Sequence, residues 1–205
     1  MTAIEARPRR WDAVVQVTHW SIAAAILVNA LIVEEGSGAH VWVGYALVAV
    51  LAVRLIWGFI GPKPARFTAF PPSPGRAVAH IGDIVAGRKP VHASHNPLGA
   101  LMVYAIWGTL GVVIASGIAM AGLPDTATLR TIASPSAMVA TESGDEAGER
   151  EGSEQGEDQE ELLEEVHEMA VNVLYLLILL HIAGVIFESR RSGRHIVMAM
   201  IPGPR

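Results

Sequence analysis

The stretch EEVHEMAVNVLYLLILLHIAGVIFES, from Glu164 to Ser189, decides the fold class of this chain. Its apolar part has about the 20 residues that a helix needs to cross a hydrocarbon core of roughly 30 Å. It nevertheless holds two histidines, His167 and His181, which are 14 residues apart. Ionisable groups inside a membrane are costly, so each suggests a function. The alternative is that both rings simply lie near the ends of the span.

Three further segments have the same character, and the chain as a whole is 51% hydrophobic with a positive mean hydropathy. Backbone groups in lipid must bond within their own segment, which makes each of these segments a helix. The first follows three arginines but is too long for a signal peptide and has no small-residue cleavage site after it. We therefore predict an all-α membrane protein, a single domain over residues 1–205 with a bundle of four transmembrane helices, at about 14–33, 41–60, 98–122 and 166–187.

The chain has no cysteine. This excludes disulfides, thiolate metal sites, iron–sulfur clusters and haem attached covalently through a CxxCH motif. Any metal chemistry must use histidines, carboxylates or a noncovalent cofactor.

Positive charge is concentrated on one side of the predicted spans. The segments between spans on the other side carry only Arg130 and Arg150. The excess of lysine and arginine in cytoplasmic segments then places both termini and the 61–97 loop in the cytoplasm. The residues that carry this signal are Arg7, Arg9, Arg10, Lys63, Arg66, Arg76, Arg88, Lys89, Arg190, Arg191, Arg194 and Arg205.

The outer loop runs from about Leu123 to Glu165, and its second half is a low-complexity acidic run, ESGDEAGEREGSEQGEDQEELLEE; the acidic, disordered part is expected over 123–161. A segment with so few apolar residues buries too little surface to fold alone, and we expect it to be disordered as far as Leu162. It is either a solvated linker or a docking surface that steers a basic soluble partner by charge.

Four of the eight histidines lie in or at the edges of spans, and their depths form a pattern. His19 is near the cytoplasmic start of the first span, and His40 is at the outer start of the second. In the fourth span, His181 is about 21 Å deeper than His167 at 1.5 Å per residue, and the two rings face within about 40° of each other. The sequence therefore predicts two pairs at two depths, His19 with His181 and His40 with His167.

Two facing imidazoles without a thiolate or carboxylate suit the axial ligation of haem iron. A zinc site would need four ligands close together. Small residues one turn from each histidine leave room for a flat macrocycle, although small residues also help membrane helices to pack. The alternative for the rings themselves is a set of interhelical hydrogen bonds. The small residues are Ala23, Gly44, Ala170 and Gly184.

These segments resemble a known family, the bacterial cytochromes b561, which are grouped with the cytochrome b subunits of nickel–iron hydrogenases. The resemblance rests on RRWDAVVQVTHW, AHVWVGYALVAVLAVRLIWGFIGP, FTAFPPSP with HNPLGALM, and EVHEMAVNVLYLLILLHIAGVIFES, in that order. It implies four helices and two haem b groups, with ligands from the first, second and fourth helices. Those ligands would be His19, His40, His167 and His181, and the acidic insert departs from the shortest members.

Arg54 and His95 are further candidates at the cytoplasmic side. Arg54 either extends to the headgroups or pairs with a haem propionate. His95 precedes Asn96 and Pro97, a good helix start, and is a candidate contact for a propionate or a quinone. Asn29 and Asn172 are expected to form interhelical hydrogen bonds.

The sequence thus predicts a di-haem b-type cytochrome of the bacterial inner membrane. It would carry electrons by outer-sphere transfer between the quinone pool and a redox partner, such as a periplasmic c-type cytochrome drawn by the acidic loop. No nucleic-acid partner is expected, and whether the chain acts alone as a quinol oxidoreductase is left open. The alternatives are a haem-containing anchor subunit of a hydrogenase or dehydrogenase, and a haem-free transporter of divalent metal.

Overall fold

A computed structural model of the chain describes residues 11–88, 95–124, 154–193 and 195–201. All the regular elements in this part of the chain are helical. Four helices are long and apolar enough to cross a membrane: α1 (Ala13–Leu31), α2 (Gly38–Ile60), α4 (Pro97–Ala121) and α6 (Glu154–Ser192). The shorter ones are α3 (Pro74–Val85), α7 (His195–Met200) and two 3₁₀ turns, η1 (Lys63–Ala65) and η2 (Phe67–Ala69). The prediction of an all-helical membrane protein with four spans is confirmed.

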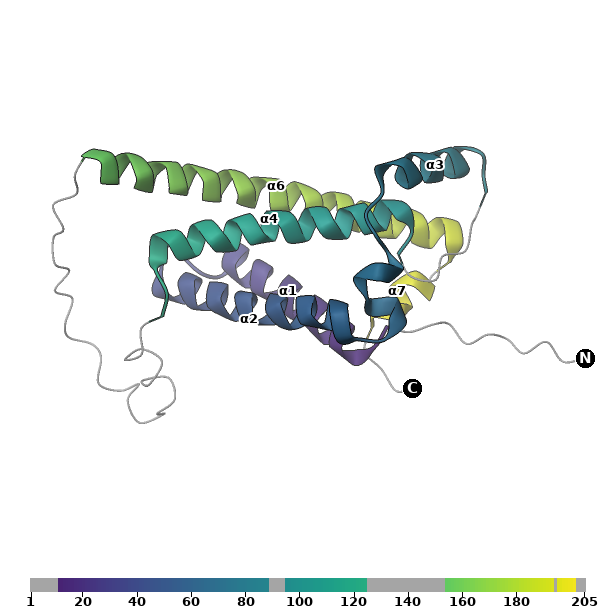
Figure 1. The fold of residues 1–205 in the computed structure, drawn as a ribbon, viewed down its shortest axis with the longest axis horizontal. Coiled ribbons are helices and arrows are strands. Elements are labelled where there is room, and N and C mark those ends of the chain that lie inside the picture. The colour runs from purple at the N-terminus through teal and green to yellow at the C-terminus, as the bar shows by residue number, and fades with distance from the viewer. Residues whose placement is uncertain (1–10, 89–94, 125–153, 194, 202–205) are drawn as a thin grey trace, which may run out of the picture.

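The spanning helices form two layers (Figure 1). α1 packs against α2, α4 packs against α6, and a contact between α2 and α4 joins the layers. The centre of the bundle is built from Leu47 and Leu51 of α2, Leu110 of α4 and Leu174 of α6. Lipid tails are as apolar as these side chains, so van der Waals packing rather than water exclusion holds the layers together. Large apolar residues on the outer faces, such as Phe59 and Leu179, are correspondingly exposed.

Polar side chains fix where each of the first three spans begins. The Asp12 carboxylate accepts hydrogen bonds from the backbone N–H groups of Val14 and Val15, and Ser37 Oγ accepts one from the N–H of His40. Asn96 Oδ1 accepts one from Gly99, and Pro97 is the first residue of α4, as predicted. These caps satisfy donors that a helix start leaves unpaired.

The two ends of the bundle differ in charge. At one end, which we call the basic end, lie Lys63, Arg66, Arg76, Arg88, Arg190 and Arg191, together with α3 and α7. At the opposite end, which we call the acidic end, lie Glu34, Glu35, Asp158, Glu160, Glu161, Glu164, Glu165 and Glu168. The chain alternates between the ends through α1, α2, α4 and α6, so four spans bring it back to the end where it started.

The predicted extent of the acidic outer loop was wrong at its second boundary. Helix α6 begins at Glu154, so residues 154–161 are helical rather than irregular. Glutamate and glutamine are good helix formers, and adding a residue to an existing helix avoids the cost of nucleation. The apolar span supplies that existing helix. The rest of the predicted loop, over 125–153, lies outside the described residues.

Helix α7 closes the basic end against the start of α1. The carbonyl of Ala199 accepts hydrogen bonds from the backbone N–H of Trp11 at 3.2 Å and from Gln16 Nε2 at 2.9 Å. The indole N–H of Trp20 donates to the carbonyl of Met200 at 2.9 Å. These bonds satisfy polar groups at the last turn of α7, and they hold the first turns of α1 in place.

Candidate functional site

The four predicted histidines form two pairs, one near each end of the bundle. At the basic end, His19 of α1 faces His181 of α6, and their ring centroids are 6.3 Å apart. At the acidic end, His40 of α2 faces His167 of α6, and the ring centroids are again 6.3 Å apart. We call these the basic-end pair and the acidic-end pair. The pairing expected from depth is therefore confirmed, and the role of the rings as ligands remains a prediction.

The separation of the rings matches what two imidazoles sharing one metal require. A metal–imidazole bond of about 2.0–2.1 Å, plus roughly 1.1 Å from the nitrogen to the ring centre, gives about 6.2–6.4 Å for two opposed rings. The same distance occurs at both ends of the bundle. All four rings are half-buried.

The surroundings of the pairs also suit a haem. A Cβ atom built on Gly44, one turn from His40, or on Gly184, close to His181, would meet no heavy atom within 4 Å. Space is thus open beside a ligand at each end. Within the described ranges no group of three or more His, Cys, Asp or Glu side chains is arranged to hold a metal ion. Two imidazoles per site are the donor set expected where a porphyrin supplies the remaining ligands.

Arg54 of α2 lies inside the bundle rather than extending to the headgroups. Its side chain is only 5% exposed, and Cζ is 4.9 Å from the centroid of the Trp107 ring on α4. Its Nη1 has no hydrogen-bond partner among the described residues. A guanidinium over an aromatic face is stabilised by the ring quadrupole, but the buried N–H still calls for an acceptor. Of the two predicted roles, pairing with a carboxylate fits this geometry and snorkelling does not.

His95 precedes α4 and lies close to the basic-end pair. Its ring is 5.0 Å from that of Trp11 and 4.7 Å from that of Phe70, centroid to centroid. Burial first, and then the positive charge of Arg54 and of the basic-end pair, lower the pKa of His95 to about 4. The ring is therefore neutral at pH 7 and carries one N–H donor and one acceptor nitrogen.

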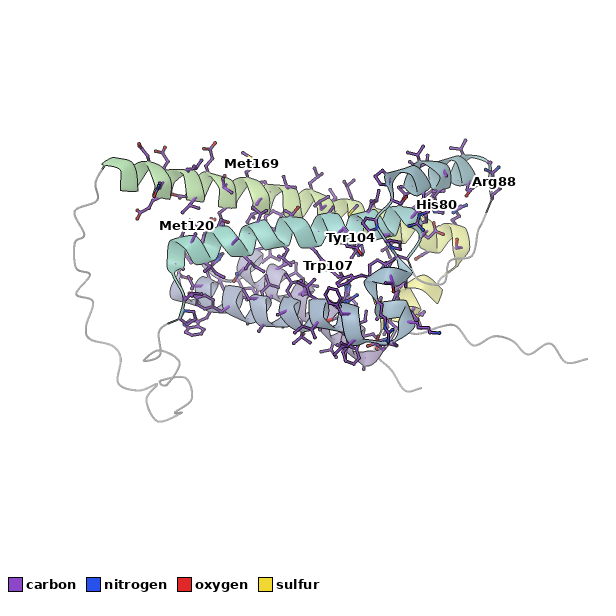
Figure 2. The ribbon with its side chains drawn as sticks, viewed as in Figure 1. His80, Arg88, Tyr104, Trp107, Met120 and Met169 are labelled. Carbon is purple, nitrogen blue, oxygen red and sulfur yellow. The ribbon has the colours of Figure 1, made fainter. Side chains whose placement is uncertain are left out.

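An aromatic cluster surrounds these residues at the basic end. Phe67 lies against Phe59, Phe70, Tyr104 and Trp107. Figure 2 shows Tyr104 and Trp107 on the part of α4 nearest α3. The sequence analysis missed this cluster, because its members come from three separate segments. The aromatic residues of FTAF and of α4 were the available signal.

The acidic-end pair has polar neighbours of its own. Ser116 Oγ of α4 is 2.9 Å from His167 Nδ1, a contact that the sequence analysis missed. Asn29 of α1 donates from Nδ2 to the backbone carbonyl of His40 at 3.3 Å, which confirms its predicted interhelical role. The same prediction finds no support at Asn172, which is exposed on α6.

One known protein family matches nearly the whole chain. The sequence profile of the prokaryotic cytochrome b561 family matches residues 10–203. The chain belongs to this family. Cytochromes b561 and the related hydrogenase cytochromes b typically bind haem b in a helical membrane bundle. Comparison with curated proteins and with solved structures gave no match.

Proposed function

We propose that this cytochrome b561 family member holds two haem b groups, one between His19 and His181 and one between His40 and His167. The observation that carries the proposal is the same 6.3 Å separation of ring centroids at both ends of the bundle. A bound haem b supplies reversible one-electron chemistry, and two histidine ligands leave no position on the iron for substrate. The expected activity is then outer-sphere electron transfer across the membrane.

The residues of this chain would hold and orient the two groups. The four imidazoles would hold the haems, and the apolar centre around Leu110 and Leu174 keeps water away from the space between the two sites. Arg54 would donate hydrogen bonds to a haem propionate at the basic end, because its buried Nη1 has no partner among the described residues and a carboxylate would satisfy it. His95, neutral at pH 7, is placed to hydrogen-bond either a second propionate or a quinone.

The proposed direction of insertion follows from charge. Clustered lysine and arginine at the basic end support an insertion into a bacterial inner membrane with that end, and both termini, on the cytoplasmic side. Quinone in the bilayer is proposed as one redox partner. A soluble, positively charged redox protein such as a c-type cytochrome is proposed at the acidic end, where carboxylates of α6 are exposed. An anchor role for a hydrogenase would use the same two haems and differ only in the partner.

The first test is spectroscopic. We would record the reduced-minus-oxidised spectrum of the purified protein and measure haem per chain by the pyridine haemochrome assay. Low-spin b-type bands and two haems per chain are expected. A colourless protein that takes up no added haem would refute the proposal and bring the metal-transport alternative forward, and one haem per chain would mean that one pair is wrong.

Variants then assign each haem to its pair. His19→Ala and His181→Ala should each leave one haem, and His40→Ala and His167→Ala should each leave the other. His80→Gln is the matched control, because His80 is a buried histidine of α3 that belongs to neither pair. It should retain both haems. Loss of both haems from every variant, control included, would show that the assay reports folding rather than ligation.

A further inference from the structure

One ring of the acidic-end pair contacts a buried hydroxyl group. The ring of His167 contacts Ser116 of α4, a helix that contributes none of the four histidines. Ser116 is 4% exposed, so this hydroxyl is a buried polar group within an apolar span. Buried polar groups of spans are expensive unless they are satisfied, and they are often functional.

The position of the single hydroxyl proton can be deduced. Ser116 Oγ lies 2.8 Å from the carbonyl oxygen of Val112 and 3.2 Å from that of Val113. A carbonyl only accepts, so the hydroxyl must donate its proton to this side. The contact of 2.9 Å with His167 Nδ1 is then a hydrogen bond only if Nδ1 carries the proton. Nε2 of His167 is left with its lone pair free, which is the state that a metal ligand needs.

The backbone of α4 constrains the same ring. A Cβ atom at Gly117 would lie 3.3 Å from His167 Cε1, closer than most side-chain contacts, and 3.7 Å from Nδ1, which is ordinary van der Waals contact. The imidazole is therefore seated against the helix where Gly117 leaves room for it. His40, the other member of the pair, has a buried Nδ1 without a hydrogen-bond partner among the described residues. The two rings of this pair are thus held differently.

We propose that Ser116 is the positioning residue of the acidic-end site: its hydroxyl accepts the Nδ1 proton of His167, beside the backbone carbonyl of Val113, which accepts from the same ring, and together they fix the tautomer and the rotation of that ring. This rests on the proposed function, because His167 must be a haem ligand. An acceptor at Nδ1–H makes the imidazole more basic toward metal, which favours the oxidised iron and lowers the reduction potential. The acidic-end haem therefore has its potential set in part by a residue that does not touch it.

The test compares three variants of the haem-loaded protein. Ser116→Ala removes the hydroxyl acceptor and leaves only the backbone carbonyl of Val113, Ser116→Thr keeps a hydroxyl, and Thr18→Val is the matched control. Thr18 is 5% exposed, and its hydroxyl donates to the carbonyls of Val14 and Val15 without touching a histidine. Each protein is titrated optically for two midpoint potentials and examined by low-temperature EPR for the signals of the two low-spin haems. The His181→Ala protein, which keeps only the acidic-end haem, assigns the signals.

In Ser116→Ala we expect the midpoint potential of the acidic-end haem to rise and its EPR signal to shift, with the other haem unchanged. The affinity for the acidic-end haem should fall roughly 10- to 100-fold, as for the loss of other partners of metal-bound histidines. Ser116→Thr should return both readouts to near the wild-type values, and Thr18→Val should leave both haems as they are.

Other outcomes overturn the proposal. A Ser116→Ala protein with two haems and an unchanged acidic-end potential and EPR signal would show that the hydroxyl does not act on the ligand. Equal shifts at both haems would mean that it acts through the fold. Neither result touches the proposed function, which fails instead if the wild-type protein holds no haem.

Discussion

His95 shows how strongly one side chain depends on its surroundings at the basic end. Its ring lies between Trp11 and Phe70, and Arg54 adds positive charge nearby. The pKa of His95 is about 4, compared with about 6.5 in an unfolded chain. At a pH between these two pKa values, the unfolded protein binds a proton at His95 and the folded protein does not. Stability is then fully present above pH 6.5 and falls as the pH drops toward 4.

This difference makes a prediction for His95→Gln, which keeps a polar side chain but does not titrate. The wild-type protein should lose at most about 1.4 kcal/mol of stability per pH unit between pH 6.5 and 4 through this group, and the variant should lose none of it. Apparent melting temperatures of both proteins in detergent, measured from pH 7.5 to 4.5, give the comparison. If the melting temperatures of the two proteins changed in parallel with pH, the low pKa assigned to His95 would be contradicted.

At the residue scale, the sequence was sufficient for the histidine pairs but not for their neighbours. The rise of 1.5 Å per residue converts a spacing of 14 into a depth, and depth alone decides which rings meet. The contact between Ser116 and His167 depends instead on the rotation and axial position of α4 relative to α6. Because α4 is apolar on nearly every side, no pattern in its sequence indicates which side faces α6.

Among the elements, the contact between α2 and η2 is the tightest place to test packing. A Cβ atom at Gly58 of α2 would overlap the ring of Phe67. We expect Gly58→Ala to lower the free energy of unfolding by about 1–3 kcal/mol, the usual cost of forcing extra volume into a packed interior. Gly82→Ala is the control, because a Cβ at that position in α3 meets nothing within 4 Å.

Thermal unfolding of the two alanine variants decides the point. The Gly82 variant should be as stable as the wild-type protein or slightly more so, since alanine is the better helix former. Equal stability of both variants would show that Phe67 moves aside at little cost.

Helix ends were the part of the fold that sequence patterns described least well. The starts of α1, α2 and α4 are marked by Asp12, Ser37 and Asn96, whose side chains cap the helices. The charged first turns of α6, by contrast, look like a linker by composition alone. Local composition fails there because the helix is continued from a neighbouring segment rather than started in place.

For the whole molecule, the proposed orientation can be tested with the chain's lack of cysteine. Single cysteines at Glu35, which is exposed at the acidic end, and at Arg88, whose side chain is 64% exposed at the basic end, would be the only thiols present. A membrane-impermeant maleimide should label Glu35→Cys in intact spheroplasts, and Arg88→Cys only after permeabilisation. The reverse pattern would place the basic end outside and refute the proposed insertion.

Because α6 contributes a ring to each pair, it fixes how far apart the two sites are along the membrane normal. The separation is about 21 Å, so an electron passing between the proposed haems crosses roughly two-thirds of a hydrocarbon core of about 30 Å. The membrane voltage acts on one charge with about 2.3 kcal/mol per 100 mV over the full thickness. The equilibrium ratio of electron occupancy at the two sites should then change about tenfold for each 100 mV. A change in membrane voltage would therefore shift the redox equilibrium between the two proposed haems.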